Sequence, residues 1–254
     1  MKNIIKFFVK HIPRRYLILL SRFFSIFIRI FYLGNRYYCP ICKSHFRKFL
    51  PYGNKGKENR LCPKCLSLER HRLIWLYLST KTNLLNREIS FLHIAPEQPF
   101  LKKFQKQKNW KYVTADLESP IADVKMDIRN MPFNDEEFDF VMCNHVLEHI
   151  DDDLKAMKEI YRVLKKGGSA ILQVPIDNNL ESTYEDFTIT DPKEREKHFG
   201  QYDHVRVYGK DYAERLKNAG FKVEINDYVK TLTKEEIDLY RLDENEYIYI
   251  AHKV

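Results

Sequence analysis

The stretch that decides the fold is residues 138–149, which read FDFVMCNHVLEH. Its first half is almost entirely apolar, as expected for a strand buried on both faces of a parallel sheet. Two polar residues, Asn144 and His145, follow where that strand should end. Open parallel sheets bind ligands at the carboxyl ends of their strands, so both residues are candidates for a functional site.

Similar short apolar segments recur on both sides of this stretch. Strands are predicted at 89–94, 111–115, 123–126, 138–142, 169–174, 222–228 and 246–251, and helices at 66–84, 100–107, 151–164 and 211–219. Gly167 and Gly220 are expected to end the last two helices. Alternating strands and helices predict an α/β fold with a parallel sheet. The long polar segment 177–201 is typical of a lid.

Residues 162–168, RVLKKGG, match a helix-to-strand turn at a fixed distance from residues 138–149. With these two blocks, the chain from residue 89 onward resembles class I S-adenosylmethionine-dependent methyltransferases, specifically the bacterial methyltransferase type 11 group. The resemblance implies a doubly wound, Rossmann-like seven-stranded sheet, S-adenosyl-L-methionine as cofactor and enzymatic methyl transfer.

The resemblance also implies cofactor ligands. Asp116 closes the second strand and corresponds to the ribose ligand, at the roughly twenty-residue spacing of nucleotide-binding sheets. Asp127 corresponds to the acceptor for the adenine amino group, and Ile128 to the apolar cover of the ring.

At the end of the first strand the sequence departs from the family, because residues 91–97, FLHIAPE, contain no glycine. Ala95 is the smallest residue there, and Glu97 could bind the cofactor's ammonium group. We therefore expect His93, Ala95, Glu97 and Asn144 at the cofactor. A non-catalytic binding protein with the same fold is the alternative that the missing glycines raise.

Few residues are obligatory for methyl transfer, because the enzyme chiefly aligns donor and acceptor. A hydroxyl acceptor would need a base, and His145 is the first candidate, with Asn144 beside it; a core hydrogen-bonding role for His145 is the alternative. Residues 204–208, HVRVY, resemble the His-x-Arg-x-Tyr segment of related methyltransferases. The resemblance implies that this segment lines the acceptor site, and it makes His204 a third candidate. Alternatively, this segment is a structural loop in which Arg206 pairs with an acid.

Two CxxC pairs, Cys39/Cys42 and Cys62/Cys65, have the spacing of a four-thiolate zinc site. Because protein would fill all four positions, we expect a structural Zn2+. A redox pair and an iron–sulfur cluster are the alternatives. The fifth cysteine, Cys143, lies in an apolar, strand-like run, so a reducing cytosol fits better than a disulfide scaffold.

Charge is distributed unevenly along the chain. The formal net charge is +8, yet residues 1–72 contain 17 Lys or Arg and only two acids. Residues 16–33 are strongly apolar, with Arg15, Arg22 and Arg29 at seven-residue intervals, the pattern of an interfacial amphipathic helix. Arginine near a bilayer centre costs roughly 2.5–3.5 kcal/mol, which disfavours a membrane span. Packing of this helix on the protein's own body or on a partner subunit is the alternative.

These observations predict three parts: a basic amphipathic helical segment (1–35), a zinc module (36–66) and a methyltransferase domain (67–254). We expect a cytoplasmic enzyme, peripheral at the inner membrane surface, that methylates a saccharide or small lipid-linked acceptor. An RNA methyltransferase with a zinc module for RNA binding is an alternative, because the basic front of the chain also suits nucleic-acid phosphates.

Overall fold

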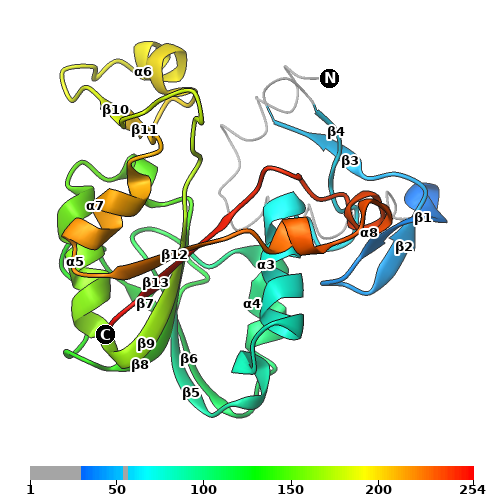
Figure 1. Cartoon of the computed structure of the whole chain (residues 1–254), viewed down its shortest axis with the longest axis horizontal. Coiled ribbons are helices and arrows are strands. Elements are labelled where there is room, and N and C mark those ends of the chain that lie inside the picture. The colour runs from blue at the N-terminus through cyan, green and yellow to red at the C-terminus, as the bar shows by residue number, and fades with distance from the viewer. Residues whose placement is uncertain (1–29, 54–56) are drawn as a thin grey trace. The chain divides into compact units, whose positions relative to one another are not determined.

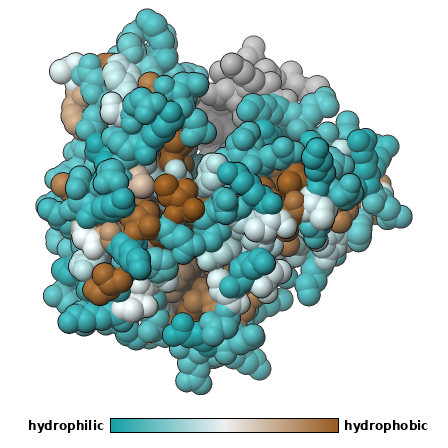
Figure 2. Space-filling view, in the orientation of Figure 1, coloured by the Kyte–Doolittle hydropathy of each residue, from teal (hydrophilic) through white to brown (hydrophobic). Residues whose placement is uncertain are grey.

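The computed structural model describes residues 30–53 and 57–254 (Figure 1). The predicted amphipathic helix lies outside the described residues except for its last turn, residues 30–32, which is helical. No helix among the described residues is long and apolar enough to cross a bilayer. On the face shown in Figure 2, hydrophilic residues predominate and hydrophobic ones form small separate groups.

The described residues form two compact units. The first comprises the described part of residues 1–82 together with Gln98–Phe100 and Val229–Glu246; the second comprises Asn83–Glu97, Leu101–Tyr228 and Tyr247–Val254. The predicted boundaries at 35/36 and 66/67 stay a prediction.

The second unit is built on a seven-stranded sheet. Its strands are β5 (Ile89–Ile94), β6 (Trp110–Asp116), β7 (Val124–Lys125), β8 (Phe138–Asn144), β9 (Leu164–Gln173), β12 (Lys222–Asn226) and β13 (Ile248–His252), in the order β12-β13-β9-β8-β5-β6-β7. All neighbours are parallel except β13, which is antiparallel to both β9 and β12. The predicted Rossmann-like α/β fold is confirmed.

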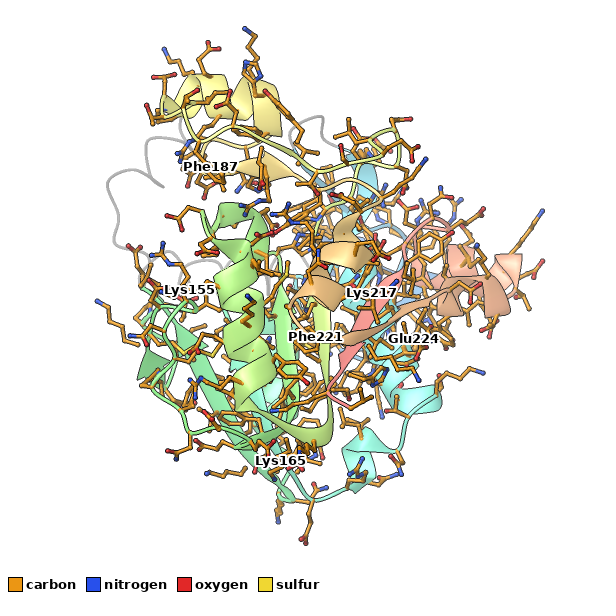
Figure 3. The ribbon with its side chains drawn as sticks, turned by 60° about the vertical axis from the view of Figure 1, so that its left-hand side comes forward. Lys155, Lys165, Phe187, Lys217, Phe221 and Glu224 are labelled. Atoms are coloured by element: carbon orange, nitrogen blue, oxygen red, sulfur yellow. The ribbon has the colours of Figure 1, made fainter. Side chains whose placement is uncertain are left out.

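Apolar side chains fill both faces of the sheet, because alternate residues of a strand point to opposite sides. On one face, Leu92 and Ile94 of β5 join a core with α5 (Asp153–Val163) and α7 (Tyr212–Asn218). Figure 3 shows α5, which carries Lys155, lying across the strands. On the other face, Phe91 packs against Phe104 of α4 (Gln98–Phe104), with ring centroids 5.2 Å apart.

Local signals explain most element ends, with one correction. Gly220 follows α7 with φ +107°, as a helix-terminating glycine should. Gly167, in contrast, lies within β9, because α5 already ends at Val163 and the chain turns directly into the strand. The predicted lid region contains β10 (Tyr184–Glu185), paired with β11 (Arg206–Val207), and α6 (Pro192–Phe199).

In the part of the chain that the structure describes, the first unit contains two hairpins and two longer helices. β1 (Leu33–Cys39) pairs with β2 (Ser44–Phe46), and β3 (Leu50–Tyr52) pairs with β4 (Lys57–Leu61). The helices are α3 (Glu69–Thr80) and α8 (Lys234–Tyr240). Tyr37, Phe46 and Phe49 are buried around the cysteines and form a small aromatic core.

Candidate functional site

The candidate site lies where the sheet changes its winding direction. The strand following β5 in sequence, β6, lies on one side of it, and β8 lies on the other. The two ends are joined directly, because Asn144 Nδ2 at the end of β8 donates a 2.7 Å hydrogen bond to Glu97 Oε2 after β5. Such switch points are where open α/β sheets bind ligands.

Two non-glycine residues at these strand ends adopt left-handed backbone conformations. Ala95 has φ +49° and His145 has φ +54°. Each such residue costs about 1–3 kcal/mol unless its surroundings hold it there. Ala95 N donates to Ala115 O at 2.8 Å, and His145 N donates to Gln173 O at 2.7 Å. The turn that lacks glycine therefore still takes the conformation that glycine usually provides.

Buried polar atoms without partners gather at the same place. Within the described part of the chain, Asn144 Oδ1, His145 Nε2 and Glu148 Oε2 are inaccessible to solvent and accept no hydrogen bond. His145 Nδ1 lies 3.2 Å from Glu148 Oε1. Each unsatisfied buried group costs about 1–3 kcal/mol, so a polar ligand that approached these atoms would recover part of that cost.

The predicted cofactor ligands make different contacts within the protein. Asp116 Oδ1 accepts from Glu118 N and Ser119 N at 2.8 and 2.6 Å, which turns the chain sharply after β6. Both oxygens of Asp127 are bound by Arg129, and these hydrogen bonds lower the pKa of Asp127. Ile128 is only 5% exposed and belongs to the core.

His93 is fully buried within β5. Its Nδ1 lies 2.8 Å from Tyr112 Oη, and its Nε2 accepts a long 3.5 Å hydrogen bond from Glu97 N. The ring therefore helps to fix the turn that carries Glu97. Direct contact of His93 with a cofactor stays a prediction.

The segment around His204 is held against the loop after β8. Its neighbour Val205 N donates to Glu148 O at 3.0 Å, and the ring of His204 meets that of His149 edge to face at 4.7 Å. Burial lowers the pKa of His204, and the proximity of His149 lowers it further. The three predicted catalytic residues, Asn144, His145 and His204, thus come from one region, and Glu148, which the sequence did not single out, lies among them.

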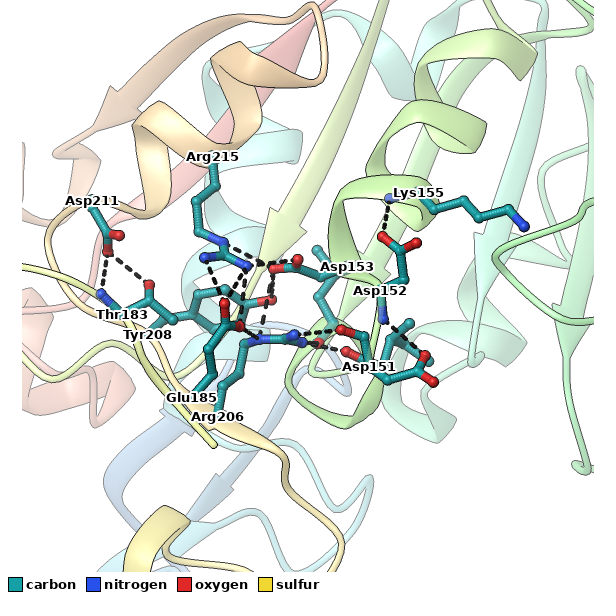
Figure 4. Close-up of polar contacts among 12 residues, drawn as sticks. Asp151, Asp152, Asp153, Lys155, Thr183, Glu185, Arg206, Tyr208, Asp211 and Arg215 are labelled. Carbon is teal, nitrogen blue, oxygen red and sulfur yellow. Dashed lines mark hydrogen bonds and ion pairs between the residues drawn. The ribbon is translucent and has the colours of Figure 1, made fainter. Parts of the chain in front are cut away.

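Arg206 and Tyr208, which were expected to line an acceptor site, instead form a buried polar cluster (Figure 4). Arg206 donates to Glu185 Oε2 at 2.8 Å and to the backbone oxygens of Leu147, Ile150 and Asp151. Tyr208 Oη donates to Asp153 Oδ2 at 2.7 Å. The structural alternative for Arg206 is therefore the one observed.

The four predicted zinc ligands converge in the first unit. Their sulfurs all lie within 4.8 Å of one another, with Cys39 Sγ 3.5 Å from Cys65 Sγ and Cys42 Sγ 3.7 Å from Cys62 Sγ. Sulfurs bound tetrahedrally to Zn2+ at about 2.3 Å would stand about 3.8 Å apart. All five cysteines are free thiols, so the residues present fit the ion.

Outer contacts also suit a thiolate site. The hydroxyl of Ser67, fully buried, lies 3.4 and 3.3 Å from the sulfurs of Cys39 and Cys65. Two basic residues near the cysteines make structural contacts. Arg72 is buried and binds the backbone oxygens of Ser67, Tyr240 and Arg241. Arg60 pairs with Glu69 at 2.8 Å.

Part of the chain is similar in sequence to known proteins. Residues 81–172 match the family model described as a methyltransferase domain. An uncharacterized protein of Methanocaldococcus jannaschii is 36% identical over 94 residues, 37% of this chain and 42% of that one. The demethylmenaquinone methyltransferase of Staphylococcus epidermidis is 44% identical over 61 residues, 24% of this chain and 25% of that one.

A crystal structure of the 1,6-didemethyltoxoflavin-N1-methyltransferase of Burkholderia thailandensis is 15% identical, with a TM-score of 0.45, over 72% of this chain and 76% of that one. The chain spans less than half the length of either sequence relative. The second unit itself has a Rossmann-like α/β fold with a seven-stranded sheet.

Proposed function

We propose that the second unit is an S-adenosylmethionine-dependent methyltransferase. One observation carries this proposal: the Glu97–Asn144 bridge at the switch point, surrounded by unpartnered buried polar atoms. The match of residues 81–172 to a methyltransferase domain supports it. The strand ends of β5, β6 and β8 then form the cofactor site.

Asp116, Glu97 and Asp127 are the proposed cofactor ligands. One oxygen of Asp116 holds the turn, so its second oxygen is the one to accept from the ribose hydroxyls. Glu97 would pair with the cofactor's ammonium group, and Ile128 would lie beside the adenine. When bound, S-adenosylmethionine supplies a methyl group activated by the positively charged sulfur.

His145 is the proposed base for a hydroxyl acceptor. The Glu148 carboxylate 3.2 Å from its Nδ1 favours the tautomer with the proton on that nitrogen. The Nε2 atom is then the acceptor for the proton that the hydroxyl loses. Asn144 and His204 are proposed to position donor and acceptor.

We further propose a small-molecule acceptor, either a saccharide or a lipid-linked compound at the inner membrane surface of a cytoplasmic enzyme. Relatives whose names include the acceptor demethylmenaquinone support a small molecule. The membrane contact rests on the basic segment 1–35, most of which lies outside the described residues. Flotation with anionic vesicles, lost on deletion of residues 1–33, tests it.

The cysteine cluster is proposed to hold one structural Zn2+. Its ligands are Cys39, Cys42, Cys62 and Cys65, and the distances between their sulfurs support tetrahedral binding. The ion would hold together the two hairpins beside their small aromatic core.

Calorimetry with S-adenosylmethionine and S-adenosylhomocysteine tests the main proposal. We expect both to bind, and Asp116→Ala to weaken binding about 10- to 100-fold, because hydrogen bonds to a charged group contribute about 1.5–3 kcal/mol. Glu118→Ala is the matched control, because Glu118 is an exposed carboxylate two residues away. Absence of heat and of a thermal shift with either compound would refute catalysis and favour a non-catalytic binding protein.

The RNA alternative has one specific observation behind it. Arg36, Arg47 and Lys48, with Glu58 and Asn59, line a hollow of about 380 Å³ in the first unit. A gel shift with cellular RNA at low salt, lost in Arg47→Ala, would favour an RNA acceptor over a small molecule.

A further inference from the structure

Three side chains that commonly bind metals meet next to the proposed methyl-transfer site. Glu148 and His149 belong to the short helix η2 (Leu147–His149), and His204 precedes β11. One ligand atom from each lies within 4.8 Å of the others. Two imidazoles and one carboxylate form the donor set typical of divalent transition metals.

The two histidines are oriented as metal ligands usually are. His149 Nδ1 lies 3.3 Å from Asp203 O and 3.4 Å from Asp203 Oδ2. His204 Nδ1 lies 3.2 Å from Phe199 O. Histidines that bind a metal through one nitrogen almost always donate the other N–H to a carboxylate or a backbone oxygen. Both rings therefore present Nε2 as the available ligand.

The carboxylate supplies an independent observation. The Glu148 side chain is 2% exposed, and its Oε2 is buried with no hydrogen-bond partner in the described chain. Burying a charge without compensation is strongly unfavourable. A cation beside Oε2 would compensate it, while Oε1 keeps its contact with His145.

The backbone holds the two ligand-bearing segments together without an ion. Val205 N donates to Glu148 O at 3.0 Å, and the buried Arg206 binds the oxygens of Leu147, Ile150 and Asp151. The three ligands are thus placed before any metal arrives, which lowers the entropic cost of binding it.

We propose that Glu148, His149 and His204 bind one divalent transition-metal ion, with remaining coordination positions open to an oxygen of the methyl acceptor. Three protein ligands with an open position are the arrangement of catalytic zinc sites, in contrast to closed structural ones. Metal binding itself does not depend on the proposed methyltransferase function. Only the contact of the metal with the methyl acceptor rests on that function.

Cobalt titration of the untagged full-length chain, stripped of metal, tests this site. Co2+ at four thiolates gives an intense charge-transfer band, which a site of nitrogen and oxygen ligands lacks, so the two sites are counted separately. We expect one Co2+ per chain that contributes no thiolate band, in addition to the one bound by the four thiolates. His149→Ala and His204→Ala should lose this equivalent and keep the thiolate one, and His198→Ala, the matched control, should keep both.

Asp203→Asn covers the case in which a ligand variant fails to fold. This change leaves all three ligands intact and replaces the carboxylate beside His149 Nδ1, whose other oxygen accepts from the exposed Gln201 side chain. We therefore expect cobalt affinity to fall about 10- to 100-fold. The proposal is overturned if the wild-type chain takes up no thiolate-free Co2+, or if that equivalent persists in both histidine variants. Calorimetry with S-adenosylhomocysteine on the same wild-type sample reports the proposed methyltransferase function separately.

Discussion

The side chain of Arg206 offers the sharpest test of how the site is positioned. Its guanidinium is completely buried and donates to Glu185 and to three backbone oxygens of residues 147–151. This loop carries Glu148 and His149. We therefore expect Arg206→Ala to destabilise the second unit and to displace the ligands of the proposed metal site at the same time.

The expected loss of unfolding free energy follows from the groups that lose a hydrogen-bond partner in Arg206→Ala. Removing one member of a buried ion pair costs about 3–5 kcal/mol. Glu185 is partly exposed and keeps Arg215 at 3.2 Å, which reduces that term. Three backbone oxygens lose a donor, at about 1 kcal/mol each. The loss should therefore be about 3–5 kcal/mol of unfolding free energy.

Urea unfolding followed by tryptophan fluorescence measures this loss. The chain has two tryptophans, so a Trp75→Phe background leaves Trp110 of β6 as the reporter of the second unit. Lys210→Ala is the matched control, because Lys210 forms an exposed ion pair with Glu181 and should cost only about 0–1 kcal/mol. A loss of unfolding free energy below about 1 kcal/mol for Arg206→Ala would falsify the stabilising role that we assign to this residue.

Three further changes test other parts of the molecule. Ala95→Gly should raise thermal stability or leave it unchanged, since glycine adopts φ +49° freely, whereas Ala95→Val should lower it by about 1–3 kcal/mol; the reverse order in thermal melts would contradict the strained turn. Hydrogen bonds from Arg162 lower the pKa of Glu159, so its stabilisation is present above about pH 4.3 and is lost as pH falls through the lowered value. Glu159→Gln should therefore flatten the acid limb of stability against pH, and the exposed Glu196→Gln should not. Chelation should remove Zn2+ from the four cysteines and unfold the hairpins. Cys62→Ser should unfold them without chelator, and unchanged circular dichroism in both cases would argue against a structural ion.

Much of the fold was predictable because its signals are local. The apolar run 89–94 became β5 with the same bounds, and residues 138–142 fall within β8. Asn144 and Glu97 were predicted at strand ends, and the parallel pairing of β5 with β8 brings those ends together. The convergence of the two CxxC pairs was likewise predictable from their spacing.

Other features depend on contacts between residues far apart in sequence. Nothing local indicates that residues 229–246 join the unit that contains the cysteines, yet Arg72 binds the backbone oxygens of Tyr240 and Arg241 there. Arg206 was predicted near the acceptor, but the fold buries it against a loop more than fifty residues away in sequence.

By itself, the sequence determined which segments become strands and helices, because periodicity and turn residues act over a few positions. Only the tertiary structure decided which polar side chains are buried together, as at Glu148, His149 and His204. The physical reason is that burial and pairing arise when distant segments pack, and a side chain's chemistry changes with the atoms that then surround it.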